Sequence, residues 1–376
     1  MSRTPHRVLV FRKRLLPYSE TFIADQGRFL PTWQASFAGL YRQDSGLQLL
    51  GDAERLILQD MVPSSFWARF ALRSGLRVDN AWSNALETCS PRLVHAHFVN
   101  DGLDALRLQR NLQCPVVTTL HGHDITKPQP RPWQGRGSRS LFAGCDRIIA
   151  VSNFIAGHAL RKGCPENKLV QHYIGIDLEK FSMAKNETAE PSVLFVGRLA
   201  DKKGVTYLLD ALARLKNTVP GVYLTVVGSG GLLPRLHQQA EEQELDVRFA
   251  GRKTPAEVRQ LLSTHWVFAA PSITADNGDA EGLGMVFLEA QAMHTPVLSF
   301  RSGGVVEAVA DGETGLLCAE KDVPALADNL QTLLNSKQLR ATMGAAGRSR
   351  VERNFDIRQQ CGKLEAIYNS VVSGKG

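Results

Sequence analysis

The chain has 376 residues, 43% hydrophobic and 22% charged, which is typical of a soluble protein large enough for two domains. No apolar run reaches the ~18 residues of a membrane span, and six scattered cysteines without paired spacing indicate free thiols in a reducing cytosol rather than a zinc site. Residues 1–180 hold 23 Lys and Arg against 15 Asp and Glu, a net charge of +8, whereas residues 181–376 hold 21 against 22, a net charge of −1.

This uneven charge favours an anionic partner for the first half of the chain. No nucleic-acid-binding motif accompanies the basic residues, so we expect contact with the anionic inner face of the cytoplasmic membrane rather than with nucleic acid. An ordinary solvated surface would give the same balance, and that alternative stays open. The N-terminal apolar run of four residues is too short for a signal peptide, which predicts a cytoplasmic protein. The sequence does not indicate an oligomeric state.

Short β-branched runs alternate with helical patterns along the chain, as is typical of α/β proteins with parallel sheets. The predicted strands of the first half are 8–11, 33–37, 93–97, 116–120, 148–151 and 170–173. Those of the second half are 193–196, 223–227, 247–249, 266–269, 297–299 and 316–318.

The strand pattern predicts two doubly wound, Rossmann-like domains facing across a cleft. We expect an N-terminal domain at 1–180, a linker without apolar periodicity at 181–191 and a C-terminal domain at 192–355. A last helix at 356–376 is expected to return to the N-terminal domain. In such folds the ligand binds at the carboxyl ends of the strands.

Two segments of the first half stand out near its start. Ser19 is a predicted N-cap for a helix whose apolar residues keep helical spacing after the first strand. Residues 64–77 mix aromatic side chains with arginines, so both contact with a membrane interface and packing within the first domain are open.

Histidines cluster after two predicted strands of the first half. His121, in the run His121-Gly122-His123-Asp124, is placed to hydrogen-bond a sugar hydroxyl or to assist proton transfer. His95 and His97 could join it in a metal site. We expect each pair spaced i, i+2 to point to opposite faces, which disfavours a metal cluster.

In the second half, a strand ends at Gly197, followed by Arg198, and Lys203 stands just before Gly204 and a helix. A planar guanidinium beside an ammonium suits a diphosphate leaving group. Basic residues flanking an ordinary turn are the alternative.

Two further strand ends of this half carry glycines. The run 226–234 resembles a dinucleotide fingerprint, but its third glycine position is Leu233, so we expect a tight turn with close backbone packing. Arg252 follows the next strand, a position from which it can contact a nucleotide base, although basic residues after strands are not specific to nucleotide sites. No D-x-D pair occurs in the chain, and cationic side chains with helix amides can neutralise a diphosphate without a cation. We therefore predict no metal.

The most informative segment is Glu281-Gly282-Leu283-Gly284-Met285, with Glu289 four residues further on. The glycines allow close backbone approach, and the first N–H groups of the helix that follows point at an anion. Eight helical residues separate the two carboxylates by about 12 Å, a span that suits one on a sugar and one on a ribose. Hydrolase carboxylates would converge to roughly 5–9.5 Å. A buried helix with chance glutamates remains the alternative.

Together, the Gly197-Arg198, Lys203-Gly204, Glu281…Glu289 and His121-Gly122-His123-Asp124 motifs resemble those of the retaining glycosyltransferases of family 4, which have the GT-B architecture. Segments 19–23 and 276–282 are similar to those of its exopolysaccharide branch, the colanic acid and amylovoran biosynthesis enzymes. The resemblance covers nearly the whole chain and is strongest over 193–317.

The resemblance implies a role for each motif. Arg198 and Lys203 would hold the donor diphosphate, and Glu289 would bind the ribose. Glu281 would contact the transferred sugar near its reacting carbon, and His121 would hydrogen-bond that sugar. The amides that assist at the diphosphate would be those of Gly282, Leu283, Gly284 and Met285. Independently of the resemblance, the position of Arg252 after a strand makes it a candidate for the nucleotide site.

By the same resemblance, a hexose would pass from a nucleoside-diphosphate sugar, UDP preferred over GDP, to a glycan or polyprenyl-pyrophosphate-linked acceptor. Configuration would be retained without a cofactor, the leaving phosphate accepting the acceptor's proton. A sugar phosphorylase or epimerase and an inactive scaffold of a membrane assembly are the alternatives. The chain departs from the family at Pro17-Tyr18-Ser19-Glu20, where many relatives have a glycine-rich loop, and at His294, where glycine is common.

Overall fold

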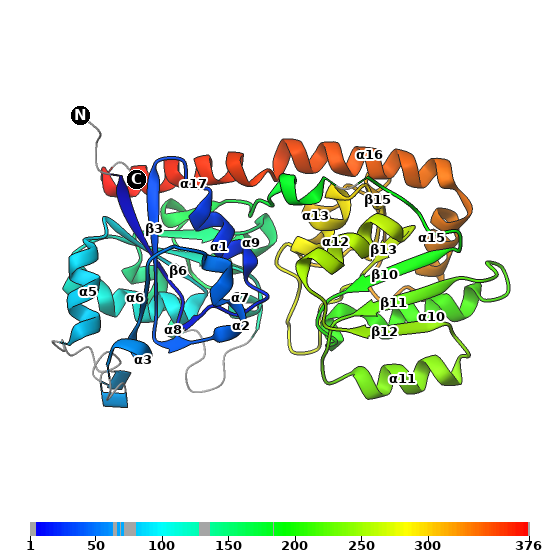
Figure 1. The fold of residues 1–376 in the computed structure, drawn as a ribbon, viewed down its shortest axis with the longest axis horizontal. Coiled ribbons are helices and arrows are strands. Elements are labelled where there is room, and N and C mark those ends of the chain that lie inside the picture. Colours follow the sequence, from blue (N-terminus) through cyan, green and yellow to red (C-terminus); the bar gives the residue numbers. More distant parts are fainter. Residues whose placement is uncertain are drawn as a thin grey trace. The chain divides into compact units, whose positions relative to one another are not determined.

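The computed structural model describes residues 5–62, 66–67, 69–70, 80–127, 136–182 and 184–374, which form two compact units (Figure 1). The first unit comprises Met1–Gly175 and Ile357–Gly376, and the second comprises Ile176–Asp356. The last helix, α17 (Ile357–Val372), therefore belongs to the first unit. Residues of the expected linker, 181–191, belong to the second.

The first unit is built on a seven-stranded parallel sheet in the order β5-β3-β1-β6-β7-β8-β9. Its strands are β1 (His6–Phe11), β3 (Trp33–Gly39), β5 (Arg55–Ile57), β6 (Leu93–His97), β7 (Val116–Leu120), β8 (Arg147–Ala150) and β9 (Leu169–Gln171), with a separate pair of β2 (Arg14–Leu15) and β4 (Tyr41–Arg42). Its other helices are α1 (Thr21–Arg28), α2 (Asp44–Leu47), η1 (Gln48–Leu50), α3 (Leu58–Met61), α5 (Ala81–Cys89), α6 (Val99–Leu112), α7 (His123–Thr126), α8 (Arg136–Gly144), α9 (Asn153–Arg161) and η2 (Glu166–Lys168).

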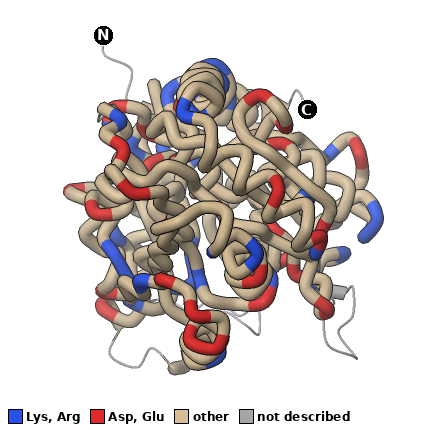
Figure 2. Tube along the Cα trace, turned by 90° about the vertical axis from the view of Figure 1, so that its right-hand side faces the viewer, with Lys and Arg blue, Asp and Glu red and all other residues tan. Residues whose placement is uncertain are grey.

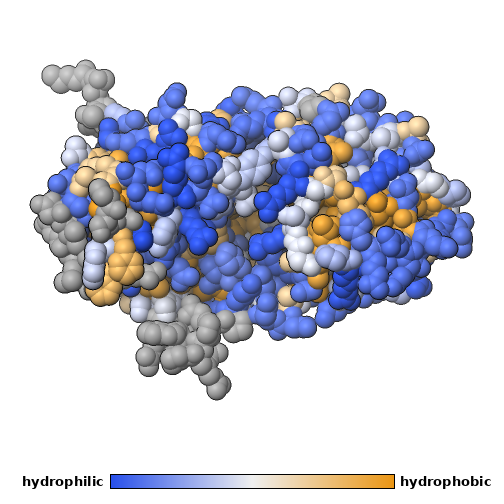
Figure 3. All heavy atoms as spheres, turned by 60° about the horizontal axis from the view of Figure 1, so that its bottom comes forward, coloured by the Kyte–Doolittle hydropathy of each residue, from blue (hydrophilic) through white to orange (hydrophobic). Residues whose placement is uncertain are grey.

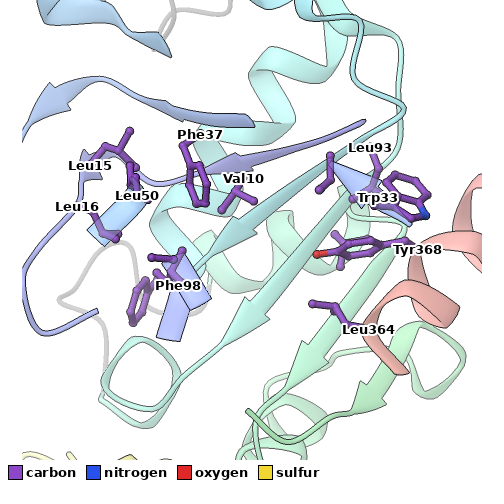
Figure 4. Packing of buried hydrophobic residues seen from close by; sticks show 14 of the residues in the cluster. Val10, Leu15, Leu16, Trp33, Phe37, Leu50, Leu93, Phe98, Leu364 and Tyr368 are labelled. Atoms are coloured by element: carbon purple, nitrogen blue, oxygen red, sulfur yellow. The ribbon is translucent and has the colours of Figure 1, made fainter. Parts of the chain in front are cut away.

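The C-terminal helix completes the core of the first unit. Leu364 and Tyr368 of α17 are both 1% exposed and pack with Trp33 of β3 and Leu93 of β6 (Figure 4). Burying an apolar side chain such as Leu364 contributes about 1.5–3 kcal/mol. The carboxylate of Glu365 also accepts hydrogen bonds from the backbone N–H groups of Thr32 and Trp33 at 2.6 and 2.7 Å. This helix is therefore an integral part of the first unit.

The second unit is a six-stranded parallel sheet in the order β12-β11-β10-β13-β14-β15. Its strands are β10 (Ser192–Val196), β11 (Tyr223–Val227), β12 (Val247–Gly251), β13 (Val267–Ala269), β14 (Val297–Phe300) and β15 (Gly315–Cys318). Its helices are η3 (Leu178–Phe181), η4 (Asp201–Lys203), α10 (Val205–Leu215), α11 (Leu233–Glu242), α12 (Pro255–Thr264), α13 (Met285–Ala292), α14 (Val305–Ala308), α15 (Val323–Asn335) and α16 (Lys337–Asn354). Basic and acidic residues are interleaved along the trace (Figure 2).

Both sheets have the doubly wound order in which the chain starts in the middle, runs to one edge and then crosses to the other side. The α/β class and its two parallel sheets are thus confirmed, and every predicted strand is present. The prediction that Ser19 caps α1 was wrong, because the N-cap is Glu20, whose side chain makes no capping bond. The carboxylate of Glu20 instead receives Nε and Nη2 of Arg12 at 2.7 and 2.8 Å.

Segment 64–77 lies largely outside the described residues. Its described members Phe66, Trp67 and Phe70 are helical, and their side chains are 64%, 66% and 53% exposed. Elsewhere in the described chain, the large hydrophobic side chains that are exposed are Leu160 and Val306. No helix among the described residues is long and apolar enough to cross a bilayer.

Candidate functional site

The switch point of the second sheet lies between β10 and β13, the neighbouring strands from which the chain departs in opposite directions. Ligands of open α/β sheets bind beyond the carboxyl ends of the strands at this point. The segment after β10 carries Gly197, Arg198 and Lys203, and the segment after β13 leads to Glu281. The fold therefore brings both predicted motifs to one place in the second unit.

The two segments touch through their backbones. Gly204 has φ of +64°, and a Cβ on it would lie 1.9 Å from the carbonyl oxygen of Pro271, so that only glycine fits. The N–H of Ile273 donates to the carbonyl of Lys202 at 2.8 Å. This close packing sets the spacing between the lysines of η4 and the loop after β13.

Two ion pairs link the same segments through their side chains. Lys203 Nζ pairs with Glu281 Oε2, and Lys202 Nζ pairs with Asp279 Oδ1 at 3.0 Å. The four side chains are only 11–14% exposed. The sequence singled out Lys203 and Glu281 but not the Lys202–Asp279 pair, whose members are 77 residues apart.

The lysines determine the charge state of Glu281. Burial acts to raise the pKa of Glu281, but the ammonium groups of Lys203 and Lys202 outweigh burial and hold the pKa below the ordinary 4.5. Glu281 is therefore a carboxylate at neutral pH. It can accept hydrogen bonds or stabilise positive charge, but it has no proton to give.

Helix α13 starts directly behind Glu281. Its N-cap is Gly284, with φ of +84° and no side-chain cap, and the first N–H groups of a helix lack partners within that helix. A Cβ on Gly304 would lie 2.0 Å from the Gly282 carbonyl oxygen, and the Gly304 N–H donates to the Glu281 carbonyl at 2.8 Å. The loop after β14 thus fixes the backbone of the turn from behind. Helix amides at the positive end of the dipole, with an ammonium such as that of Lys203 beside them, have the chemistry to bind an anion.

The other predicted residues of this unit lie on α13 and just after β10 and β12. Glu289 is half-buried at the start of the second turn of α13, and Arg198 is exposed after β10. Arg252, after β12, donates through Nε to Ser229 Oγ at 2.7 Å. The 226–234 turn packs closely, as predicted, since a Cβ on Gly228 would lie 1.9 Å from a carbonyl of the β10 loop.

His121 lies in the first unit, directly after β7, and it is not alone there. Its Nε2 is 3.0 Å from Nδ1 of His97, and the rings of His95 and His97 are 4.4 Å apart. Our expectation that paired histidines point to opposite faces was wrong for His95 and His97, because residues two apart in a strand share a face. Among the described residues no group of His, Cys, Asp or Glu is arranged to hold a metal ion.

Burial keeps these imidazoles neutral. It lowers the pKa of His95 to about 3, with nearby His172 adding to the effect. It also lowers the pKa of His97 and of His121 well below 6.5, reinforced by the neighbouring histidines and by Arg12. His121 is therefore a neutral hydrogen-bonding group at pH 7 rather than a cation.

Sequence reasoning missed the ionic cluster beside these histidines. Arg12, the first residue after β1, donates through Nη1 to Asp101 of α6 at 2.6 Å in addition to its pair with Glu20, and its guanidinium lies 4.5 Å from the ring centre of Phe98. The pairs hold the segment after β1 against the start of α6. A basic residue at the end of a buried strand was the available signal.

Two family models match the chain. The family described as Glycosyl transferases group 1 matches residues 177–350, and Glycosyltransferase Family 4 matches residues 48–180. WcaL of Escherichia coli K12, assigned to colanic acid biosynthesis, is 30% identical over 269 residues, 69% of this chain and 66% of WcaL. The amylovoran biosynthesis glycosyltransferase AmsK of Erwinia amylovora is 29% identical over 268 residues, 70% and 66%. The chain thus spans just under two thirds of the length of these two relatives.

Two further similarities are to a GDP-mannose-dependent enzyme and to a protein solved with UDP and glucose. A GDP-mannose-dependent alpha-(1-6)-phosphatidylinositol monomannoside mannosyltransferase of Mycolicibacterium smegmatis is 32% identical over 268 residues, 67% of this chain and 69% of that enzyme. Among solved structures, HepE of Anabaena in complex with UDP and glucose aligns with a TM-score of 0.77 at 20% identity, over 97% of this chain and all of HepE.

Proposed function

The chain belongs to the GT-B glycosyltransferases with a family 4 and a group 1 domain. On that premise, we propose that it transfers a hexose from a nucleoside-diphosphate sugar in exopolysaccharide biosynthesis. The proposed acceptor is a glycan or a polyprenyl-pyrophosphate-linked molecule. The observation that carries this proposal is the Lys203–Glu281 pair at the start of α13, where an ammonium, a carboxylate and helix amides meet. This combination suits a nucleotide sugar, because its diphosphate is anionic and its sugar develops positive charge as the bond breaks.

In the proposed mechanism, Lys203 and Arg198 stabilise the negative charge that grows on the departing diphosphate, together with the amides of Gly282 to Met285. The ionised Glu281 stabilises the opposite charge on the sugar, near its reacting carbon. A leaving phosphate oxygen accepts the proton of the acceptor hydroxyl on the same face, so that configuration is retained. These cationic groups neutralise the diphosphate, so we propose that transfer needs no metal ion.

The remaining residues would recognise the rest of the donor. Glu289 would accept hydrogen bonds from the ribose hydroxyls, and Arg252 would contact the base. His121, neutral at pH 7, would hydrogen-bond the transferred sugar. We propose UDP over GDP as the nucleotide, in line with the HepE complex, although the mannosyltransferase relative depends on GDP-mannose.

The transfer proposal can be tested with water as the acceptor. Purified protein would be incubated with UDP-glucose, UDP-galactose or GDP-mannose in EDTA, and nucleotide release would be measured with the released sugar's anomer read by ¹H NMR before mutarotation. We expect release from a UDP-sugar with the α-anomer retained. Glu281→Gln should reduce release by about 100-fold or more, whereas Glu313→Gln, an exposed acid of the same unit, should not.

Several outcomes would contradict this proposal. A product with inverted configuration would contradict the retaining mechanism. A strict requirement for a metal ion would contradict the proposal that transfer needs no metal. Nucleotide binding without release by the wild type, even with a lipid-linked acceptor fraction added, would point to a scaffold.

We also propose that the first unit contacts an anionic membrane surface. The support is the charge of +8 on residues 1–180 and the exposed aromatic side chains of Phe66, Trp67 and Phe70. On the face of the molecule shown in Figure 3, hydrophobic residues also occur in patches among hydrophilic ones. Amphipathic aromatic rings favour the interface between headgroups and acyl chains.

Co-sedimentation with vesicles tests this contact. Vesicles with anionic phosphatidylglycerol should bind the wild type, neutral phosphatidylcholine vesicles should bind it less, and Trp67→Ser should weaken binding. Val306→Ser, which removes a 48% exposed side chain of the second unit, is the control. Equal binding of all proteins to both vesicles would contradict the proposal.

A further inference from the structure

The proposed mechanism uses His121 alone, yet two more imidazoles lie directly behind it. His95 and His97 lie two residues apart in β6, so their side chains share one face of the sheet, and each is 1% exposed. The register of the sheet sets His97 opposite Thr119 of β7, two residues before His121. The ring of His97 is 5.2 Å from that of His121 and inclined to it by 29°.

The ring of His95 is held in place by two hydrogen bonds and supports the ring of His97. Its Nδ1 is 2.6 Å from the hydroxyl of Tyr368, and its Nε2 is 2.7 Å from Oγ1 of Thr119. Both ring nitrogens thus have partners, and the ring cannot turn without breaking two buried hydrogen bonds. The ring of His97 packs on the ring of His95, with the two ring centres 4.4 Å apart.

His121 is restrained from its other sides by aromatic rings. Phe22 of α1 lies 4.9 Å from its ring centre, and Phe98 lies 4.5 Å away. These contacts limit where the ring can lie but do not choose between its two nitrogens. Within the described part of the chain, the polar contact of the ring is that between its Nε2 and Nδ1 of His97, at 3.0 Å.

This contact has a chemical consequence because both rings are neutral. A neutral imidazole has one N–H donor and one acceptor nitrogen, so a single proton lies between His97 and His121. If Nε2 of His121 donates it, Nδ1 of His121 is an acceptor; if Nε2 accepts it, Nδ1 is a donor. Either way, His97 ties the role of Nδ1 to the hydrogen bond behind the ring.

We propose that His97 is a positioning residue, whose hydrogen bond to Nε2 of His121 fixes the orientation and the tautomer of that ring. His97 thereby determines the hydrogen-bonding role that Nδ1 of His121 presents to the transferred sugar. The inference rests on the proposed function in so far as His121 contacts that sugar. Core packing alone would give His97 no influence on the tautomer.

The chain offers a matched pair of variants at this position. Asparagine places its amide atoms at the δ position, like Nδ1 of His97, whereas glutamine places them one bond farther out, like Nε2. We therefore expect His97→Asn to preserve the contact with His121 and His97→Gln to lose it. His97→Leu removes it entirely, and the Asn and Gln pair still decides the matter if the Leu variant does not fold.

The primary readout is the tautomer of His121, measured by ¹⁵N NMR of the ring nitrogens and assigned by loss of the signals in His121→Gln. Wild type and His97→Asn should show one tautomer, and His97→Gln and His97→Leu should show a mixture. A single, unchanged tautomer in His97→Gln or His97→Leu would overturn the proposal. This measurement does not depend on any transfer activity.

The second readout is kcat/KM for the donor sugar that the wild type uses. We expect a reduction of about 10-fold in His97→Gln and restoration toward wild type in His97→Asn. Tyr368→Phe, which perturbs the same buried cluster without touching His121, should stay within about threefold. Equal losses in all three variants would mean that general destabilisation is responsible and would refute the positioning role. A mixed tautomer in His97→Gln with no transfer by the wild type would leave the contact established and reject the proposed function.

Discussion

The buried histidines make the stability of the first unit dependent on pH in the mildly acidic range. His95 packs against His97, which in turn contacts His121, and His172 and the hydroxyl of Tyr368 also lie near His95. Burial lowers its pKa to about 3, whereas the unfolded chain has about 6.5. The unfolded chain therefore binds more protons between these values, and the unfolding free energy falls as the pH drops below about 6.5.

The size of the effect follows from the same two values. For His95 alone, proton linkage gives a loss of about 2 kcal/mol between pH 7.5 and pH 5. The pKa values of His97 and His121 are lowered as well, so they act in the same direction. A loss of this size is a large fraction of the 5–15 kcal/mol that is typical of a folded domain.

Urea unfolding at the two pH values measures this loss. In a Trp266→Phe background, the four remaining tryptophans all belong to the first unit, and their fluorescence reports on it alone. We expect the unfolding free energy to fall by at least about 2 kcal/mol at pH 5, and His95→Gln to remove about 2 kcal/mol of that fall. If the two proteins lose the same amount, His95 is not a buried neutral group and the reasoning is refuted.

Three further predictions concern the second unit. His294 follows the end of α13 with φ of +56°, so His294→Gly should raise the unfolding free energy by about 1 kcal/mol; a loss of stability in urea unfolding would contradict this. Gly204→Ala should lower it by at least about 1–3 kcal/mol, because the new Cβ would lie 1.9 Å from Pro271, and an unchanged midpoint would show that the backbones can separate. Lys202→Met and Asp279→Asn should each weaken UDP binding, measured by calorimetry. The double variant should bind UDP no more weakly than the worse of the two single variants. Additive losses of binding free energy would mean that the pair does not act as a unit.

The strands could be predicted because each is a short apolar run bounded by turn residues. β2, β4 and β5 could not, since they have only two or three residues and begin or end in exposed arginines. Arg198, Lys203 and Glu281 could be proposed as site residues from the sequence because each lies within a few residues after a strand or before a helix. Their spatial arrangement was not visible, because it depends on the backbone contact between Gly204 and Pro271.

Errors arose where side-chain direction decided the outcome. The histidines of β6 share a face because the side-chain period of a strand is two, and their link to His121 depends on the register between β6 and β7. Ser19 has the chemistry of an N-cap, but the helix starts one residue later because Glu20 is held by Arg12. The register between β6 and β7 leaves no local signal in the sequence, whereas Arg12 at the end of β1 was an available signal for the pair with Glu20. His294 was recognised as unusual, and its positive φ explains why glycine suits that position.

The central claim, that the start of α13 binds the diphosphate of a nucleotide sugar, is tested most directly by calorimetric titration of UDP, GDP and ADP in EDTA. We expect one nucleotide, UDP, to bind the wild type, and Lys203→Met to weaken its binding about 10- to 100-fold through the loss of a charge-assisted hydrogen bond. Lys216→Met, which removes a 41% exposed ammonium of the same unit, should bind like the wild type. Binding of none of the three nucleotides, or equal binding by Lys203→Met and the wild type, would contradict the claim.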